Sequence, residues 1–90
     1  MIDIVKVTGV EPREGHALFV RFSTGEEGEA DFSWVLDGVG AMAAPLGDPA
    51  YLAGAFLSNG VLTWPNGFDV DSIALYREMA AQGRLRQSAA

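Results

Sequence analysis

Three carboxylates alternate along one short stretch of the chain, at Glu27, Glu29 and Asp31. Residues two apart on a β-strand point to the same face and lie ~6.5–7 Å apart. That spacing is too wide for two of them to share one hard cation without further ligands from a loop. We therefore expect either a solvated strand face whose charges discourage edge pairing or a surface that attracts a basic partner.

A second set of oxygen-bearing side chains lies further along the chain, at Asn66, Asp69 and Asp71. The set resembles a fragment of a calcium-binding loop, but such a loop needs more oxygen ligands and a bidentate glutamate at its end. We expect Asp71 to cap a helix and Asp69 to belong to a turn. Binding of a small molecule or a divalent metal at this corner is the alternative.

The residues that usually carry catalysis are sparse. His16 is the single histidine, and it follows Gly15 in a predicted turn, where we expect it to be exposed. A serine–histidine mechanism needs a third group that orients the imidazole, and no nucleophile elbow, P-loop or dinucleotide fingerprint is present. The absence of cysteine excludes thiolate catalysis, disulfides and cysteine-ligated metals. We expect a protein that is not an enzyme, with no catalytic residue, cofactor or metal ligand to assign.

The charge is distributed unevenly over a net −6. Residues 1–71 contain eleven acidic and three basic residues, whereas residues 72–90 contain one acidic and three basic residues. Binding to nucleic acid depends largely on lysines and arginines that neutralise phosphates. Direct binding to nucleic acid is therefore not expected.

Alternation of apolar residues predicts the strands of the fold. The expected strands cover residues 2–8, 17–23, 26–32, 55–58 and 61–64. Asn59-Gly60 separates the last two, and this dipeptide is typical of a tight hairpin. In the third strand, Gly28 and Ala30 lie opposite the carboxylates and leave room for a bulky neighbour.

Capping residues predict the helices. Ser33 begins a single helical turn, Asp48 with Pro49 begins a short helix, and Asp71 begins the last helix, which Gly83 ends. The expected buried stripe of the last helix consists of Ile73, Tyr76, Met79 and Ala80.

The order of these elements indicates an α+β fold with a small antiparallel sheet of about five strands, short helices, and one C-terminal helix packed on the sheet. We expect residues 1–82 to form a single domain and residues 83–90 to form a flexible tail. Residues 1–7 lack the basic leader and apolar run of a signal peptide, and no apolar stretch approaches the ~20 residues of a membrane span. The expected location is the cytoplasm, without membrane contact.

The two tryptophans have different expected environments. We expect Trp64, beside Pro65, to fill the core of a domain that has few large residues, rather than to serve as an exposed recognition platform. Trp34 lies in a short loop helix near the acidic row, and we expect it to be partly exposed.

Three segments carry a resemblance to a known family. They are Phe22-Ser23-Thr24-Gly25-Glu26-Glu27-Gly28-Glu29-Ala30-Asp31, then Asp48-Pro49 followed by Tyr51-Leu52, then Thr63-Trp64-Pro65-Asn66-Gly67 with Asp69, Asp71 and Ala74-Leu75-Tyr76. Their order and spacing resemble the bacterial domain of unknown function 2442 family, to about residue 80. The resemblance implies a small α+β domain without an agreed activity. Some relatives are joined to a helix-turn-helix domain and others are encoded beside another small protein, which implies a regulatory or toxin–antitoxin-like role.

The function expected from the sequence is a non-enzymatic protein-interaction or regulatory module. The expected contact surface consists of Phe19, Glu27, Glu29, Asp31 and Trp34. The expected partner is a protein, such as the product of an adjacent gene, and a homo-oligomer formed by pairing of sheet edges is a further alternative.

Overall fold

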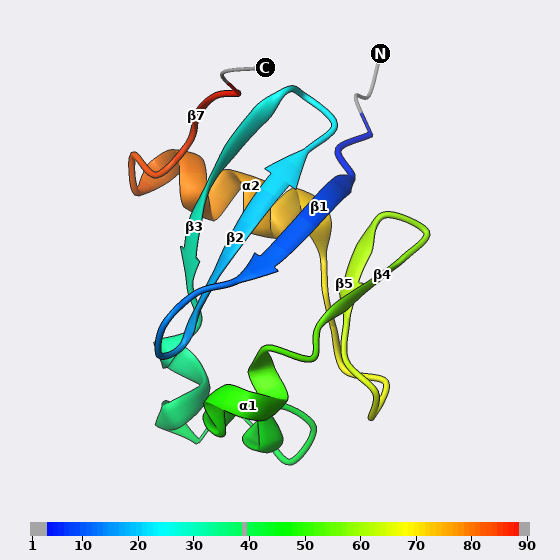
Figure 1. Ribbon diagram of the computed structural model, residues 1–90, viewed down its shortest axis with the longest axis vertical. Helices are drawn as coiled ribbons and strands as arrows, with labels where there is room; N and C mark the ends of the chain where they lie inside the picture. The colour runs from blue at the N-terminus through cyan, green and yellow to red at the C-terminus, as the bar shows by residue number, and fades with distance from the viewer. Residues whose placement is uncertain (1–3, 39, 89–90) are drawn as a thin grey trace.

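The computed structural model describes residues 4–38 and 40–88 of the chain. Two antiparallel sheets form its framework (Figure 1). The first sheet has the strand order β1-β2-β3-β7, with β1 at Val7–Pro12, β2 at Ala17–Phe22, β3 at Glu26–Asp31 and β7 at Arg86–Gln87. The second has the order β4-β5-β6, with β4 at Phe56–Ser58, β5 at Val61–Thr63 and β6 at Asp69–Val70. The predicted α+β class is confirmed, although the strands are divided between two sheets.

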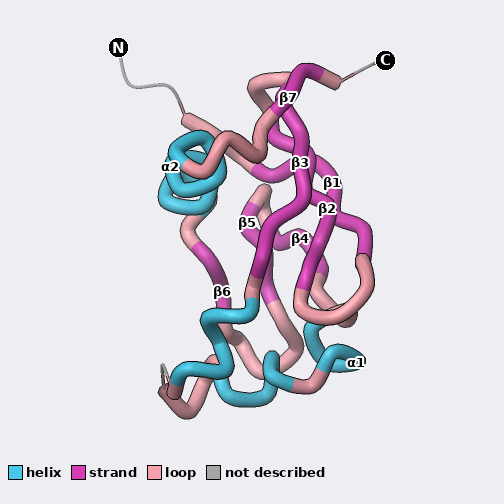
Figure 2. The backbone as a smooth tube through the Cα atoms, turned by 90° about the vertical axis from the view of Figure 1, so that its left-hand side faces the viewer, coloured by secondary structure: helices cyan, strands magenta, loops and turns pink. Residues whose placement is uncertain are grey.

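The helices occupy two separate places. The 3₁₀ helices η1 (Ser33–Asp37) and η2 (Ala44–Gly47) and the short helix α1 (Pro49–Leu52) lie together at one end of the molecule (Figure 2). Helix α2 (Ser72–Ala81) lies beside the first sheet, away from that end (Figures 1 and 2). No helix in the described part of the chain is both long and apolar enough to cross a membrane.

The inner face of the first sheet forms the core together with α2. Leu18, Val20 and Phe22 alternate along β2, and all three are buried. Phe22 meets Tyr76 of α2 edge-on, with ring centroids 5.3 Å apart. Burial of these apolar side chains is the main favourable contribution to a domain of this size.

Trp64 lies at the centre of the core, as predicted, and is 0 % exposed. Its indole N–H donates to the carbonyl oxygen of Leu52 at 3.0 Å, so the polar edge of the ring is satisfied. Its ring packs against those of Phe32 and Phe68, with centroids 5.9 and 5.8 Å away. Trp64 thereby connects β5 to the helical end of the molecule.

Local sequence explains the turns and most of the helix starts. Asn59 and Gly60 both have a positive φ, at 52° and 80°, which is the conformation of a type I′ hairpin turn. The Asp48 carboxylate accepts from the amide of Ala50 at 3.0 Å, and the Asp71 carboxylate accepts from the amide of Ala74 at 3.2 Å. Both predicted caps are confirmed.

Several sequence-based expectations differ from the structure. The expected first strand covers residues 2–8, but β1 begins at Val7 and ends at Pro12, which pairs with Leu18. Residues 2 and 3 of the expected strand lie outside the described part. Ser33 does not cap η1 with its own side chain. Of the expected stripe of α2, Met79 is buried and Ile73 and Tyr76 are partly buried, but Ala80 is exposed. Ser72 is buried and Leu75 is partly buried in addition.

The segment placed in a tail by the sequence takes part in the sheet as far as Ser88. Arg86 and Gln87 pair with Glu27 and Glu26 of β3, and the Ser88 amide donates to the carbonyl of Gly25 at 2.9 Å. The pairing extends the edge of the first sheet by one short strand.

Candidate functional site

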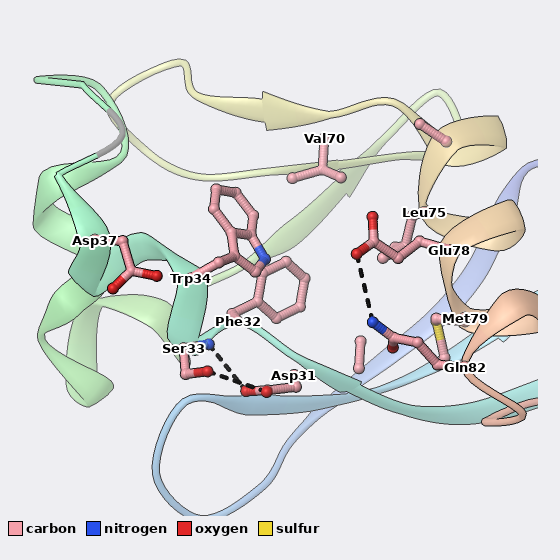
Figure 3. Close-up of a pocket in the computed structure, with 12 residues that line it drawn as sticks. Asp31, Phe32, Ser33, Trp34, Asp37, Val70, Leu75, Glu78, Met79 and Gln82 are labelled. Carbon is pink, nitrogen blue, oxygen red and sulfur yellow. Dashed lines mark hydrogen bonds between the residues drawn. The ribbon is translucent and has the colours of Figure 1, made fainter.

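A groove separates η1 from α2 and opens at the end of β3 (Figure 3). Its volume is about 470 Å³. It is lined by Ala30, Asp31, Phe32, Ser33, Trp34, Asp37, Val70, Ala74, Leu75, Glu78, Met79 and Gln82. We call it the η1–α2 groove.

The end of β3 forms one wall of the groove. The Asp31 carboxylate accepts from the Ser33 amide at 2.9 Å and from the Ser33 hydroxyl at 3.0 Å. These two bonds turn the chain out of the strand and into η1, a role for which short acidic side chains are well suited. The turn directs Trp34 into the groove, where its indole points toward Val70 (Figure 3).

Trp34 is 38 % exposed, so a large aromatic surface remains open to solvent. Its ring lies against that of Phe32, with centroids 6.0 Å apart, and Phe32 in turn contacts Trp64 of the core. Trp34 is therefore supported from below by buried aromatic residues. The predicted partial exposure of Trp34 is confirmed.

Helix α2 forms the opposite wall. Leu75, Glu78 and Gln82 follow one another at helical spacing and line the groove together. The Glu78 carboxylate points toward Trp34 (Figure 3) and accepts from the Gln82 side-chain amide at 3.4 Å.

The groove has a one-sided charge. Asp31, Asp37 and Glu78 line it, and no lysine, arginine or histidine of the described residues does. The backbone amide of Ser33, with its hydroxyl, lowers the pKa of Asp31 below its usual value, so this carboxylate is ionised at neutral pH. The groove thus combines an apolar floor with a negative rim.

Phe19, one of the predicted contact residues, lies on the opposite, outer face of the first sheet. Only 8 % of Phe19 is exposed. The guanidinium groups of Arg13, Arg21 and Arg86 cover its ring, at 4.7, 5.2 and 5.9 Å from the centroid. Cation–π attraction holds these side chains over the ring and leaves little of it for a partner.

Glu27 also belongs to this outer face and is 7 % exposed. Its carboxylate pairs with Arg21 at 3.3 Å and with Arg86 at 3.7 Å. Arg21 additionally donates to Glu11 at 2.8 Å, and this hydrogen bond lowers the pKa of Glu11. The acidic row predicted from the sequence is therefore neutralised in part by arginines of the same chain.

The predicted contact residues thus fall into two groups. Asp31 and Trp34 both line the η1–α2 groove. Glu29 is exposed and lies opposite Phe19 on the outer face, where Glu27 is also found. Alternation along the strand predicts that Glu27, Glu29 and Asp31 share one face. Asp31, at the end of β3 where the chain turns into η1, also lines the groove.

The corner around Asn66 has a structural arrangement. The Asn66 side chain donates to the Met42 carbonyl at 2.9 Å and accepts from the Phe68 amide at 3.0 Å. Asp71 caps α2. Across residues 4–38 and 40–88, no group of three or more histidine, aspartate or glutamate side chains is placed to hold a metal ion.

His16 is partly buried rather than exposed. Its Nε2 lies 2.7 Å from the carbonyl oxygen of Gly47, which links the β1–β2 turn to η2. No local pattern indicates this contact, because the two residues are 31 positions apart. The imidazole serves to hold the helical end against the sheet.

Sequence reasoning missed Asp37, Glu78, Leu75 and Val70 as members of the groove. The helical spacing of Leu75, Glu78 and Gln82 is a signal that could have identified the α2 wall. No pattern in the sequence indicates that η1 lies opposite that wall.

Comparison with known families gives one match. The family described as protein of unknown function (DUF2442) matches residues 7–81, which span both sheets and α2. The resemblance seen in the sequence is thereby confirmed. Neither the curated proteins nor the solved structures gave a significant match.

Proposed function

We propose that this chain, which belongs to the DUF2442 family, is a non-enzymatic protein-interaction module whose partner docks in the η1–α2 groove. The observation that carries the proposal is the half-open indole of Trp34, which stands over a buried aromatic support. Tryptophan is enriched among the residues that contribute most to binding between proteins. A rigid, accessible indole is suited to such an anchor role.

The dimensions of the groove support the same proposal. Its volume of about 470 Å³ could accommodate several side chains of a partner segment. Its floor contains Phe32, Leu75 and Met79, and its rim is polar. An apolar centre with a polar rim is the usual composition of a protein interface.

The regulatory role that we propose makes this chain one half of a small pair. The other half is the product of an adjacent gene, as the family resemblance implies. The one-sided charge of the groove would favour a partner with a basic docking segment.

Size-exclusion chromatography with the adjacent gene product tests this proposal. We expect one joint peak for the wild-type chain and loss of that peak for Trp34→Ala. Phe56→Ala is a matched control, since Phe56 is also an exposed aromatic residue, 45 % exposed, but lies on β4 outside the groove. The control variant should elute jointly with the partner like the wild type.

Two outcomes would count against the proposal. One is independent elution of the wild-type chain and the partner, unchanged at low salt. The other is joint elution that Trp34→Ala leaves intact, because the partner would then dock elsewhere.

A further inference from the structure

The η1–α2 groove has features that identify the kind of side chain it takes, and the inference rests on the proposed function. We propose that a partner inserts an arginine side chain into the groove. Its guanidinium stacks on the indole of Trp34 and lies between the carboxylates of Asp31 and Glu78, and its aliphatic stem lies against Leu75.

Charge complementarity is the first argument for a cationic occupant. The carboxylates of Asp31, Asp37 and Glu78 form no ion pair with a basic side chain in the described part of the chain. The outer face of the sheet differs, because Glu11 and Glu27 are already paired there with arginines. Arg84 and His16 are near enough to contribute to the lowered pKa of Asp31, after the larger effect of Ser33, but neither forms an ion pair with it in the described residues. The groove is thus an acidic surface whose carboxylates have no directly paired cation in the described part of the chain.

Hydrogen-bonding capacity is the second argument. A carboxylate offers about four lone-pair positions, and Asp31 uses two of them for Ser33. Glu78 accepts one long bond, at 3.4 Å, from Gln82. Both groups keep open acceptor positions, which a guanidinium with five N–H donors can fill.

The aromatic wall distinguishes arginine from lysine. A planar guanidinium stacks on an indole and keeps its donors in the plane, whereas an ammonium is a strongly hydrated point charge. The indole of Trp34 and the Glu78 carboxylate face each other across the groove (Figure 3). A side chain that enters between them meets an aromatic surface on one side and an anion on the other.

Nuclear magnetic resonance with capped peptides tests the inference. The probes are the acetylated and amidated tripeptides leucine–arginine–leucine and leucine–citrulline–leucine, which are nearly equal in shape, but the neutral ureido group of citrulline has an oxygen in place of one guanidinium nitrogen. The readout is the indole N–H signal of Trp34, with the signal of buried Trp64 as internal reference. We expect a saturable shift of the Trp34 signal by the arginine peptide and about tenfold weaker binding of the citrulline peptide.

Variants of the full chain complete the test. Glu78→Gln should weaken binding of the arginine peptide about tenfold and leave the citrulline peptide unaffected. Glu14→Gln is the matched control, because Glu14 is exposed in the β1–β2 turn. The substitution removes the same charge at a position away from the groove. This control variant should bind both peptides like the wild type.

Specific results would overturn the inference. Equal affinity for the two peptides, equal effects of Glu78→Gln and Glu14→Gln, or no shift of the Trp34 signal up to ~10 mM peptide would each do so. If joint elution with the partner protein still depends on Trp34 in that case, the proposed function is supported and only the arginine inference is refuted. Conversely, binding of the peptide in the groove without any effect of Trp34→Ala on joint elution would refute the proposed function alone.

Discussion

The two tryptophans show how neighbouring aromatic residues can have separate roles. Trp64 is enclosed and hydrogen-bonded to Leu52, and Trp34 stands at the surface on the far side of Phe32. The first contributes to stability and the second supplies an accessible face. Substitution of each should therefore change a different measurement.

Trp64→Ala should lower the free energy of unfolding by about 3–5 kcal/mol, because it leaves a large cavity and removes the indole hydrogen bond to the Leu52 carbonyl, which keeps only its bond from the Ala55 amide. That loss is a large part of the roughly 5–15 kcal/mol that holds an ordinary domain together. Urea denaturation measures it. Trp34→Ala should lower the free energy of unfolding by only a fraction of that amount. Equal decreases for the two variants would show that Trp34 is a core residue.

Asp31 should make the stability depend on pH. Its pKa is lowered in the folded chain by the amide and hydroxyl of Ser33, so its contribution is present above the unfolded pKa of about 3.9 and disappears as the pH falls through the folded pKa. Asp31→Asn should therefore be less stable than the wild type at pH 7, and the difference should shrink below about pH 4. Urea midpoints at several pH values measure this.

Asp69→Asn is the matched control for the pH series, since it removes one negative charge from β6 and Asp69 has no side-chain hydrogen bond in the described residues. Its urea midpoints should follow those of the wild type. A constant difference between wild type and Asp31→Asn down to pH 2 would show that the charge of Asp31 has no part in holding η1.

At the scale of elements, the turn after α2 connects the helix to the sheet edge. Gly83 has a φ of 70°, and the amides of Gly83 and Arg84 donate to the carbonyls of Ala80 and Met79 at 3.1 and 2.9 Å. These bonds form a Schellman motif. The motif places the backbone of Arg84 in contact with Gly28 of β3 and directs the chain toward β7.

Gly28→Ala should disrupt this junction. A Cβ at position 28 would lie 1.9 Å from the carbonyl oxygen of Arg84, and backbone cannot move aside as a flexible side chain can. We expect a loss of about 1–3 kcal/mol in urea denaturation and faster amide exchange at Ser88. Gly9→Ala, whose nearest atom would be Arg21 Nη1 at 3.5 Å, should be tolerated. Similar stability of the two variants would contradict the close packing at Gly28.

Much of this element structure could be predicted from the sequence. Alternation identified β2 and β3, Asn59-Gly60 identified the hairpin, and Asp48 and Asp71 identified helix starts, because each signal acts over a few residues. The pairing of β7 could not be predicted in this way. It depends on the turn at Gly83 and on space beside Gly28, which are distant in the sequence.

Only part of the candidate site could be predicted, because local sequence signals do not show which distant segments come together. Trp34 and Asp31 were identified from their local setting, and Glu78 on α2 was not. Phe19 and Glu27 looked like accessible contacts because alternation places them away from the core. Only the fold reveals that Arg13, Arg21 and Arg86 converge on Phe19 from three different segments.

At the scale of the whole molecule, charge is separated between two surfaces. The outer face of the first sheet contains arginines paired with Glu11 and Glu27, and the η1–α2 groove contains carboxylates that form no ion pair within the described residues. The two surfaces lie on opposite sides of β3. A basic partner would therefore be attracted to the groove and meet mixed charge on the outer face.

The central claim is that a protein partner docks in the η1–α2 groove, and the two indole N–H signals test it most directly. On addition of the adjacent gene product, the Trp34 signal should shift and the Trp64 signal, which lies in the core, should keep its environment. Binding that leaves the Trp34 signal unchanged, with shifts confined to the guanidinium signals of Arg13, Arg21 and Arg86, would place the partner on the outer face and contradict the claim.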